Sequence, residues 1–335
     1  MLRWLAIFLA TLSFVCNAAR ADDPPPCSGK DLLAELQTKD AAAYGAILDE
    51  AKSIPNGDAI LWKIESTAQT APSYLYGTVH LTDPRATALS RDARAALDSA
   101  RVVALELKEA VDRGELATAA MMHARLLAMP DGRNMWDLIP VEDEAVVRAS
   151  PNMPPGRADA FAAYQPWVAA AALSVPLCEI HRQTAGLDAL DATIGKRALA
   201  HHIPVEGLET LEEQLSVFAA MPLDLQARYL VATARFSGEL DDYTETMVRL
   251  YLSRRMALLM PFARHAEPVD GDSLKIMAFV ESDLVDKRNK VMLRRARPLI
   301  DGGKAFIAVG ALHLPGKNGL VALLRDAGYK MTPVN

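Results

Sequence analysis

Two stretches decide the fold, YLYGTVHL at residues 74–81 and AFIAVGALHL at residues 305–314. In each, an apolar run typical of a buried strand ends at a glycine, Gly77 or Gly310, and a histidine follows three residues later, His80 or His313. A helix-like segment and then a further strand-like segment come next in both cases. These two βαβ-like units predict that both imidazoles lie at one edge of one sheet, where open α/β sheets carry their chemistry.

The pattern of a glycine followed three residues later by a histidine is not specific by itself. The chain has seven histidines, and a histidine in such a loop often only satisfies nearby backbone groups. The shared position after a strand favours a joint role. Because imidazole is the commonest metal ligand in proteins, we expect a metal site formed by the two ends of the chain.

The order of the segments predicts an α/β fold. Strand-like runs occur near both ends, and amphipathic helical patterns fill most of the region between them. We therefore expect a central mixed sheet with a large helical insertion at about residues 110–265. A Pro-rich arm and a helix would occupy residues 22–54, and the main domain residues 55–335.

Residues 1–21 have the pattern of a cleavable secretory signal. A basic start at Arg3 is followed by an uncharged apolar run, and Ala19-Arg20-Ala21 fits the small-x-small cleavage rule. The alternative is an uncleaved anchor, which the shortness of the run disfavours. We therefore expect a secreted or periplasmic protein that is cleaved after Ala21.

Composition narrows the functional classes. The net charge of −6 disfavours a nucleic-acid partner, and no later stretch is long and apolar enough to predict an integral membrane span. Of the three cysteines, Cys16 lies in the signal segment, which leaves Cys27 and Cys178. In an oxidising compartment this pair favours a disulfide, with two unpaired buried thiols as the alternative.

Two glutamates also follow predicted strands. Glu106 is the only polar residue in the buried-looking run VVALEL at 102–107, and a buried carboxylate needs a partner. Together with His80 and His313 it forms a ligand set that leaves room for water on a catalytic divalent ion. Glu209, after the apolar segment at 203–208, is either a further ligand or a general base. The sequence does not decide which glutamate is ligand and which is base.

Other candidates carry less weight. Arg288, on a helix before the second glycine–histidine unit, is a candidate to stabilise an oxyanion or orient a carboxylate, although a solvated helix face is the alternative. His201 and His202, near Glu206, form a possible local cluster, but adjacent side chains at a helix end point in different directions. The sequence lacks H-E-x-x-H, serine-elbow, P-loop and dinucleotide motifs, which disfavours the corresponding enzyme classes.

Several motifs together resemble the TraB/PrgY/GumN family. They are LWKI at 61–64, YLYGTVHLTD at 74–83, LEL at 105–107, VEGLETLEEQ at 205–214, KRN at 287–289 and the stretch from 306 to 334. This family is similar to the Tiki metal-dependent proteases of animals, and its fold is related to the erythromycin esterases and ChaN-type haem-binding proteins. The resemblance implies that its hallmark maps onto Gly77, His80, Gly310 and His313, and most plausibly Glu106.

Taken together, residues and resemblance lead us to expect an exported metal-dependent hydrolase, and within that class a peptidase acting on a peptide or protein in the cell envelope. Ligation by nitrogen and oxygen without thiolate admits Zn²⁺, Mn²⁺ or Co²⁺. The alternatives are a non-catalytic protein that binds haem or another ligand through the same histidines, and an accessory protein of polysaccharide export.

Overall fold

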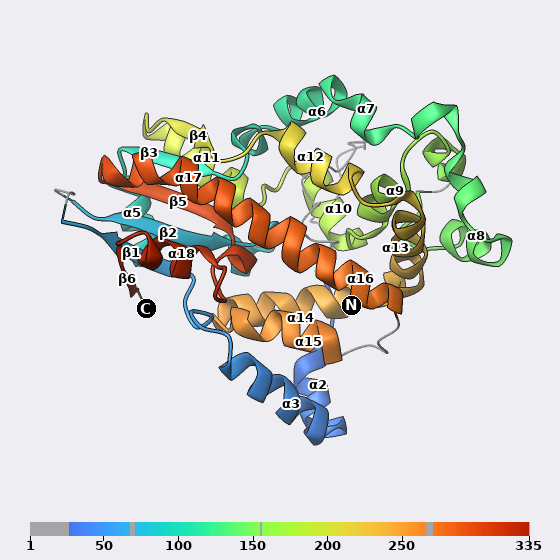
Figure 1. The fold of residues 1–335 in the computed structure, drawn as a ribbon, viewed down its shortest axis with the longest axis horizontal. Helices are drawn as coiled ribbons and strands as arrows, with labels where there is room; N and C mark the ends of the chain where they lie inside the picture. The colour runs from blue at the N-terminus through green and yellow to red at the C-terminus, as the bar shows by residue number, and fades with distance from the viewer. Residues whose placement is uncertain (1–26, 68–70, 155, 266–270, 335) are drawn as a thin grey trace.

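The structure is a computed structural model that describes residues 27–67, 71–154, 156–265 and 271–334. In these ranges a mixed sheet has the strand order β4-β3-β5-β2-β1-β6 (Figure 1). The strands are β1 Leu61–Glu65, β2 Ser73–Thr78, β3 Val102–Leu105, β4 Val205–Gly207, β5 Ala305–Gly310 and β6 Lys330–Pro333. This arrangement confirms the predicted α/β fold.

Strand β5 joins the two ends of the chain. It lies between β2 and β3 and runs parallel to both, and β3 is parallel to β4. In the register of β2 and β5, Gly77 lies opposite Val309 and Thr78 opposite Gly310. The two glycine–histidine motifs therefore leave the sheet side by side at the same edge, as the sequence predicts.

Antiparallel pairing completes the other side of the sheet. Strands β1 and β2 pair antiparallel, with Leu61 opposite Tyr76, and β6 pairs antiparallel with β1. The side chains of these strands alternate between two apolar clusters, one on each face. The sheet therefore needs helices on both faces to keep it from water.

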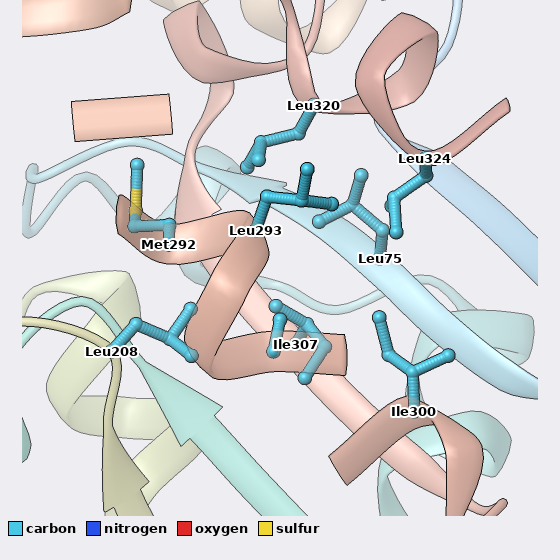
Figure 2. Close-up of a pocket in the computed structure, with 9 residues that line it drawn as sticks. Leu75, Leu208, Met292, Leu293, Ile300, Ile307, Leu320 and Leu324 are labelled. Carbon is cyan, nitrogen blue, oxygen red and sulfur yellow. The ribbon is translucent and has the colours of Figure 1, made fainter. Parts of the chain in front are cut away.

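Helices cover both faces. On one face α17 (Lys287–Asp301) and α18 (Leu320–Asp326) pack on the sheet, and α17 crosses in front of it in Figure 1. Figure 2 shows side chains of β2, β5, α17 and α18 facing one another around a void of only about 10 Å³. The opposite face is covered mainly by α5 (Arg91–Asp98), α11 (Leu190–Ala200), α14 (Leu240–Leu252) and α15 (Leu259–His265).

The central region is helical, as predicted, but it does not form one unit. Most of the buried apolar residues between Leu107 and Ala234, though not those of α11, join Ile276, Val280 and Leu284 in a core of their own, beside the sheet in Figure 1. The later helices α14 and α15 belong to the core of the sheet instead. The helices of the separate core are α6 Arg113–Met122, α7 Ala124–Leu127, α8 Val141–Arg148, α9 Pro166–Leu173, α12 Leu211–Ala219, α13 Leu223–Phe236 and α16 Gly271–Phe279.

Polar caps divide two segments that the apolar spacing predicts as single helices. Asp40 ends α2 (Leu32–Lys39) and its carboxylate accepts the Ala43 N–H at the start of α3 (Ala41–Lys52). In the same way Ser90 accepts the Ala93 N–H and separates α5 from α4 (Pro84–Thr87). Both side chains satisfy N–H groups that the helix itself leaves without partners.

A π-helical segment, η9 (Val280–Asp286), joins α16 to α17. The sequence predicts an ordinary helix from Asp283 to Ile300. π-Helical turns are rare and frequently occur at functional sites. This one directly precedes Arg288 and Asn289, which are both buried.

The N-terminal arm is attached to the middle of the chain. Cys27 and Cys178 are bonded to each other, with their Cα atoms 5.3 Å apart, which confirms the predicted pair. The predicted signal segment and its cleavage site lie outside the described residues. In the ranges that the structure describes, no helix is long and apolar enough to cross a membrane.

Candidate active site

Four predicted side chains gather at one edge of the sheet. His80, Glu106, Glu209 and His313 follow the carboxyl ends of β2, β3, β4 and β5, which are mutually parallel strands. All four side chains are buried, and His80 is the most exposed of them at 9%. Parallel strands place their carboxyl ends together, which explains why residues up to 233 positions apart meet here.

Gly310 marks the centre of the site. A Cβ atom built on this glycine would lie 3.1 Å from Glu106 Oε1, 3.5 Å from His80 Nε2 and 3.7 Å from His313 Cδ2. The three side chains that the sequence assigns as ligands therefore surround one point. A residue with a side chain at position 310 would fill the space between them.

Asp191 on α11 holds the His80 ring. Its Oδ2 is 2.7 Å from His80 Nδ1, and its Oδ1 accepts a hydrogen bond from the Thr78 hydroxyl. Because a carboxylate only accepts, His80 Nδ1 carries a proton. The other ring nitrogen, Nε2, faces Gly310 at the centre of the site. Burial alone lowers the pKa of His80, but the charge and hydrogen bond of Asp191 and the charge of Glu106 outweigh it and raise the pKa to about 9.

Asn289 on α17 holds the His313 ring in the same manner. Its Oδ1 is 2.7 Å from His313 Nδ1, while its amide Nδ2 donates to the Asn318 carbonyl and so fixes which atom faces the ring. Burial and the Arg288 charge lower the pKa of His313 to about 3, against the opposing effect of Glu106. His313 is therefore neutral, with its proton on Nδ1 and its Nε2 lone pair toward Glu106 Oε1, 3.7 Å away.

Glu106 is fixed from two sides. The Gly310 N–H donates to Oε1 at 2.6 Å, and Arg288 Nη2 donates to Oε2 at 2.6 Å. Burial raises the pKa of Glu106, but Arg288, both histidines and the Gly310 N–H outweigh it and hold the pKa at about 2. The carboxylate is charged, with Oε1 turned toward the histidines.

Arg288 links Glu106 to Glu209. Its Nε and Nη2 donate to the Glu209 carboxylate at 2.6–3.0 Å, and Nη1 donates to the Leu284 carbonyl in the π-helical segment. Although burial lowers the pKa of Arg288, the two carboxylates keep it above its ordinary value. Gln214 on α12 donates weakly to both glutamates, at 3.4 and 3.2 Å. Arg288 and Glu209 thus lie behind Glu106, as seen from the histidines.

Sequence reasoning missed Thr78, Asp191, Gln214 and Asn289. Thr78 lies inside the motif that was recognised, and Asn289 directly follows Arg288. Gln214 follows Glu209 by five residues, just inside the next helix. Asp191 had no such signal, because it stands in the middle of a helical region and only the fold of the chain brings it to His80. His201 and His202 are exposed at the far end of α11 and are not among the residues that surround Gly310.

Carboxylate groups outnumber guanidinium groups around this centre. Glu106, Glu209 and Asp191 are carboxylates less than 6% exposed, and Arg288 is the guanidinium placed among them. A cavity of about 20 Å³ opens beside them, lined by His80, Leu105, Glu106, Leu107, Ala110, Asp191 and Gln214. That volume holds about one water molecule.

The donors fit a divalent ion in type and charge: two imidazole nitrogens, a carboxylate, and an excess of buried negative charge. Each imidazole is also held at Nδ1 by an oxygen, the support that metal-ligating histidines usually have. These donors are not, however, already drawn together as they would be around a bound ion. Over the described ranges, no group of three or more His, Cys, Asp or Glu side chains is already arranged as a metal-binding cluster.

The fold and the site define an α/β protein whose paired glycine–histidine motifs, on two neighbouring parallel strands, enclose a buried carboxylate. Residues 60–333 match the TraB/PrgY/gumN family, and the chain belongs to that family. This confirms the resemblance found in the motifs. No curated protein and no solved structure matches the chain in the same comparisons.

Proposed function

We propose that this protein is a metal-dependent hydrolase in which His80 Nε2, His313 Nε2 and Glu106 Oε1 hold one divalent ion. The observation that carries the proposal is the pair of anchored rings: Asp191 and Asn289 each accept a hydrogen bond from an Nδ1–H group, and both Nε2 atoms face Glu106 beside Gly310. A histidine needed only for packing does not require its second nitrogen to be presented in this way.

The buried charges support a cation at this point. Three carboxylates and one guanidinium leave an excess of negative charge in a region of low exposure, where unpaired charge is costly. In the metal-free protein a proton on His80 offsets part of it, which is why the pKa of His80 is high. A divalent ion offsets more, and mixed nitrogen and oxygen ligation admits Zn²⁺, Mn²⁺ or Co²⁺.

The chain's own residues have distinct tasks in this proposal. A bound ion would lower the pKa of a water molecule and polarise a carbonyl group. Arg288 and the Gly310 N–H fix Glu106, and the cavity of about 20 Å³ beside His80 and Gln214 has room for the water. The same volume is too small for a porphyrin, so the site gives the haem-binding alternative no support.

The sequence-based roles of Glu209 as general base and Arg288 as oxyanion stabiliser stay predictions. Their mutual hydrogen bonds favour a supporting role, since both face Glu106 and each other. The variant Glu209→Gln separates the two roles. A loss of turnover at unchanged metal affinity indicates a base, whereas a loss of metal affinity indicates support of Glu106.

Peptides are the substrate class we propose, in an exported setting. The support is the family, with its resemblance to metal-dependent proteases, and the Cys27–Cys178 bond, which is typical of oxidising compartments. The signal-like residues 1–21 agree with export.

Elemental analysis tests the proposal. The protein is purified without chelator or metal resin and incubated with Zn²⁺, Mn²⁺ or Co²⁺, beside His80→Ala/His313→Ala and the matched control His201→Ala/His202→Ala. We expect about one ion per chain in the wild type and in the control, and none in the first variant, provided its circular dichroism is unchanged. Equal metal content in all three proteins would contradict the proposal.

A further inference from the structure

Helix α10 (Leu177–Thr184) is attached to the protein in an unusual way. Its buried side chains are Cys178, Glu179 and Arg182. Helices normally hold their place through an apolar stripe, but the only apolar member of this buried face is a cysteine of the disulfide. The position of α10 therefore depends on the disulfide and on polar contacts.

Those polar contacts lead to the loop that follows His80. The Glu179 carboxylate, fully buried, accepts hydrogen bonds from the backbone N–H of Thr82 at 2.9 Å and from its hydroxyl at 2.6 Å. Thr82 is two residues after His80. Glu179 is thus a direct link between the disulfide-bearing helix and the loop of one site histidine.

Arg182 strengthens this link at the disulfide itself. Its Nη1 lies 3.2 Å from Glu179 Oε1, 3.6 Å from Asp83 Oδ2 and 3.3 Å from Cys27 Sγ. One guanidinium therefore contacts the disulfide, the carboxylate that holds Thr82 and the residue after Thr82. Asp83 is also buried, and Arg85 binds its carboxylate with hydrogen bonds of 2.8 and 3.0 Å, so both guanidinium groups hold this segment.

We propose that the Cys27–Cys178 disulfide is a redox-sensitive brace for the site: when it is reduced, α10 loosens, Glu179 releases Thr82, and the loop of His80 loses its fixed position. Cys27 is only partly buried, so a dithiol reductant can reach the bond. The consequence for metal binding rests on the function proposed above, whereas the loosening of the loop does not.

The chemistry is thiol–disulfide exchange with a dithiol as reductant. A thiolate of the reductant forms a bond to one cysteine sulfur and the Cys27–Cys178 bond breaks. The second thiol of the reductant, as a thiolate, then attacks the reductant's own sulfur in the mixed disulfide and displaces the remaining cysteine as a thiolate. The reductant leaves as a disulfide, and Cys27 and Cys178 become thiols that carry the two protons that it gave up.

Amide hydrogen exchange of the native protein tests the brace without reference to metal or activity. We expect exchange at residues 81–84 to become at least tenfold faster after reduction with a dithiol, and in Cys27→Ser/Cys178→Ser, while strand β5 keeps its protection. Unchanged exchange at 81–84 in the reduced, folded protein would overturn the proposal.

Two further variants keep the test decisive even if reduction unfolds the protein. Glu179→Gln, with the disulfide intact, should accelerate exchange at residues 81–84, because a neutral amide holds Thr82 and Arg182 less strongly. Thr246→Ala is the matched control: Thr246 accepts the Leu32 N–H and anchors the same arm to α14 without contacting α10. Equal exchange at 81–84 in both variants would show that Glu179 is not the link.

Metal affinity then distinguishes the two proposals. If the oxidised protein binds Zn²⁺, we expect about tenfold weaker binding in the reduced protein and in Glu179→Gln, in the range for supports of metal ligands. If the oxidised protein binds no metal but exchange at 81–84 still responds to reduction, the hydrolase proposal fails and the brace stands. If the Zn²⁺ affinity is unchanged both by reduction and by Glu179→Gln, the disulfide does not regulate the site and the proposal is overturned.

Discussion

At the scale of single residues, the two motif glycines differ in what they keep clear. A Cβ on Gly310 would meet side-chain atoms of Glu106, His80 and His313, whereas a Cβ on Gly77 would meet Ala311 Cβ at 3.0 Å and its Cα at 3.1 Å. Gly310 therefore reserves space inside the site. Gly77 allows two backbone segments to approach each other.

This difference predicts opposite outcomes for two matched substitutions. Gly310→Ala should weaken Zn²⁺ binding at least tenfold, with only a small change in melting temperature. Gly77→Ala should cost about 1–3 kcal/mol of unfolding free energy through overpacking. Calorimetric titration and denaturant unfolding of both variants measure the two effects, and a Gly310→Ala protein with wild-type Zn²⁺ affinity would contradict our interpretation.

The anchor of His313 makes a second prediction at this scale. Asn289→Ala leaves His313 Nδ1 without the oxygen that orients the ring, and we expect about 10–100-fold weaker metal binding. Asn318→Ala is the control, because the Asn318 carbonyl that Asn289 uses belongs to the backbone, and the Asn318 side chain donates instead to Asp286, which is partly buried. Similar losses in both variants would argue against a specific anchor.

At the scale of elements, the start of α12 holds the segment that carries Glu209. Thr210 and Glu213 form a capping box, and Arg295 of α17 binds the Glu213 carboxylate with two hydrogen bonds of 2.7 Å. Arg295 also donates to the Leu208 carbonyl. The cap thus ties α12, the end of β4 and α17 together behind Glu106 and Glu209.

This cap predicts an acid dependence of stability. The Arg295 hydrogen bonds, helped by the hydrogen bond from the Thr210 N–H and opposed by burial, lower the pKa of Glu213 from 4.5 to about 2. The stabilisation is therefore complete above pH 4.5 and is lost as the pH falls through about 2. Because the Glu213 side chain is 42% exposed, we expect about 1 kcal/mol or less between pH 5 and pH 2, measured as the difference in urea unfolding between wild type and Glu213→Gln. Parallel pH profiles would contradict this.

Much of the fold follows from local pattern, because buried strands and amphipathic helices leave clear periodicities. The runs ending at Gly77 and Gly310 predict β2 and β5 and their shared edge. Two kinds of feature were not predicted from the sequence. One is the short cap, such as Asp40 or Ser90, which divides a segment of continuous apolar spacing into two helices. The other is the π-helical turn before Arg288, which no sequence pattern marks.

The site was predictable to the extent that its residues follow strands. His80, Glu106, Glu209 and His313 share that position, so the topology brings them together. Asp191 and Glu179 act from helices of the central region, and their role depends on tertiary packing that apolar spacing does not encode. The side chains that hold the site are therefore harder to find from sequence than those that form its centre.

At the scale of the whole molecule, the last strand protects the sheet. β6 pairs with β1, and its residue Met331 and the preceding Tyr329 are buried in the apolar cluster under α17 and α18. Without β6, the backbone of β1 would become an unpaired edge, which promotes association between chains.

Removal of residues 329–335 should therefore destabilise the protein by about 3–6 kcal/mol, the burial of two large side chains, and cause concentration-dependent association. Thr332→Ala, at an exposed position of β6, is the control and should behave as wild type. Denaturant unfolding and light scattering measure both effects. A truncated chain as stable and monodisperse as the control would contradict this role of β6.

The central position of β5 in the sheet has a consequence for how the chain folds during its synthesis. A ribosome makes β2 and β3 long before β5, yet β2 and β3 do not pair with each other. β2 can pair with β1, and β3 with β4, but only β5 joins these two pairs into one sheet. Such distant pairing makes for slow folding. A nascent chain therefore has no assembled centre, and whatever His80, Glu106 and His313 do together begins only after nearly the whole polypeptide has been made.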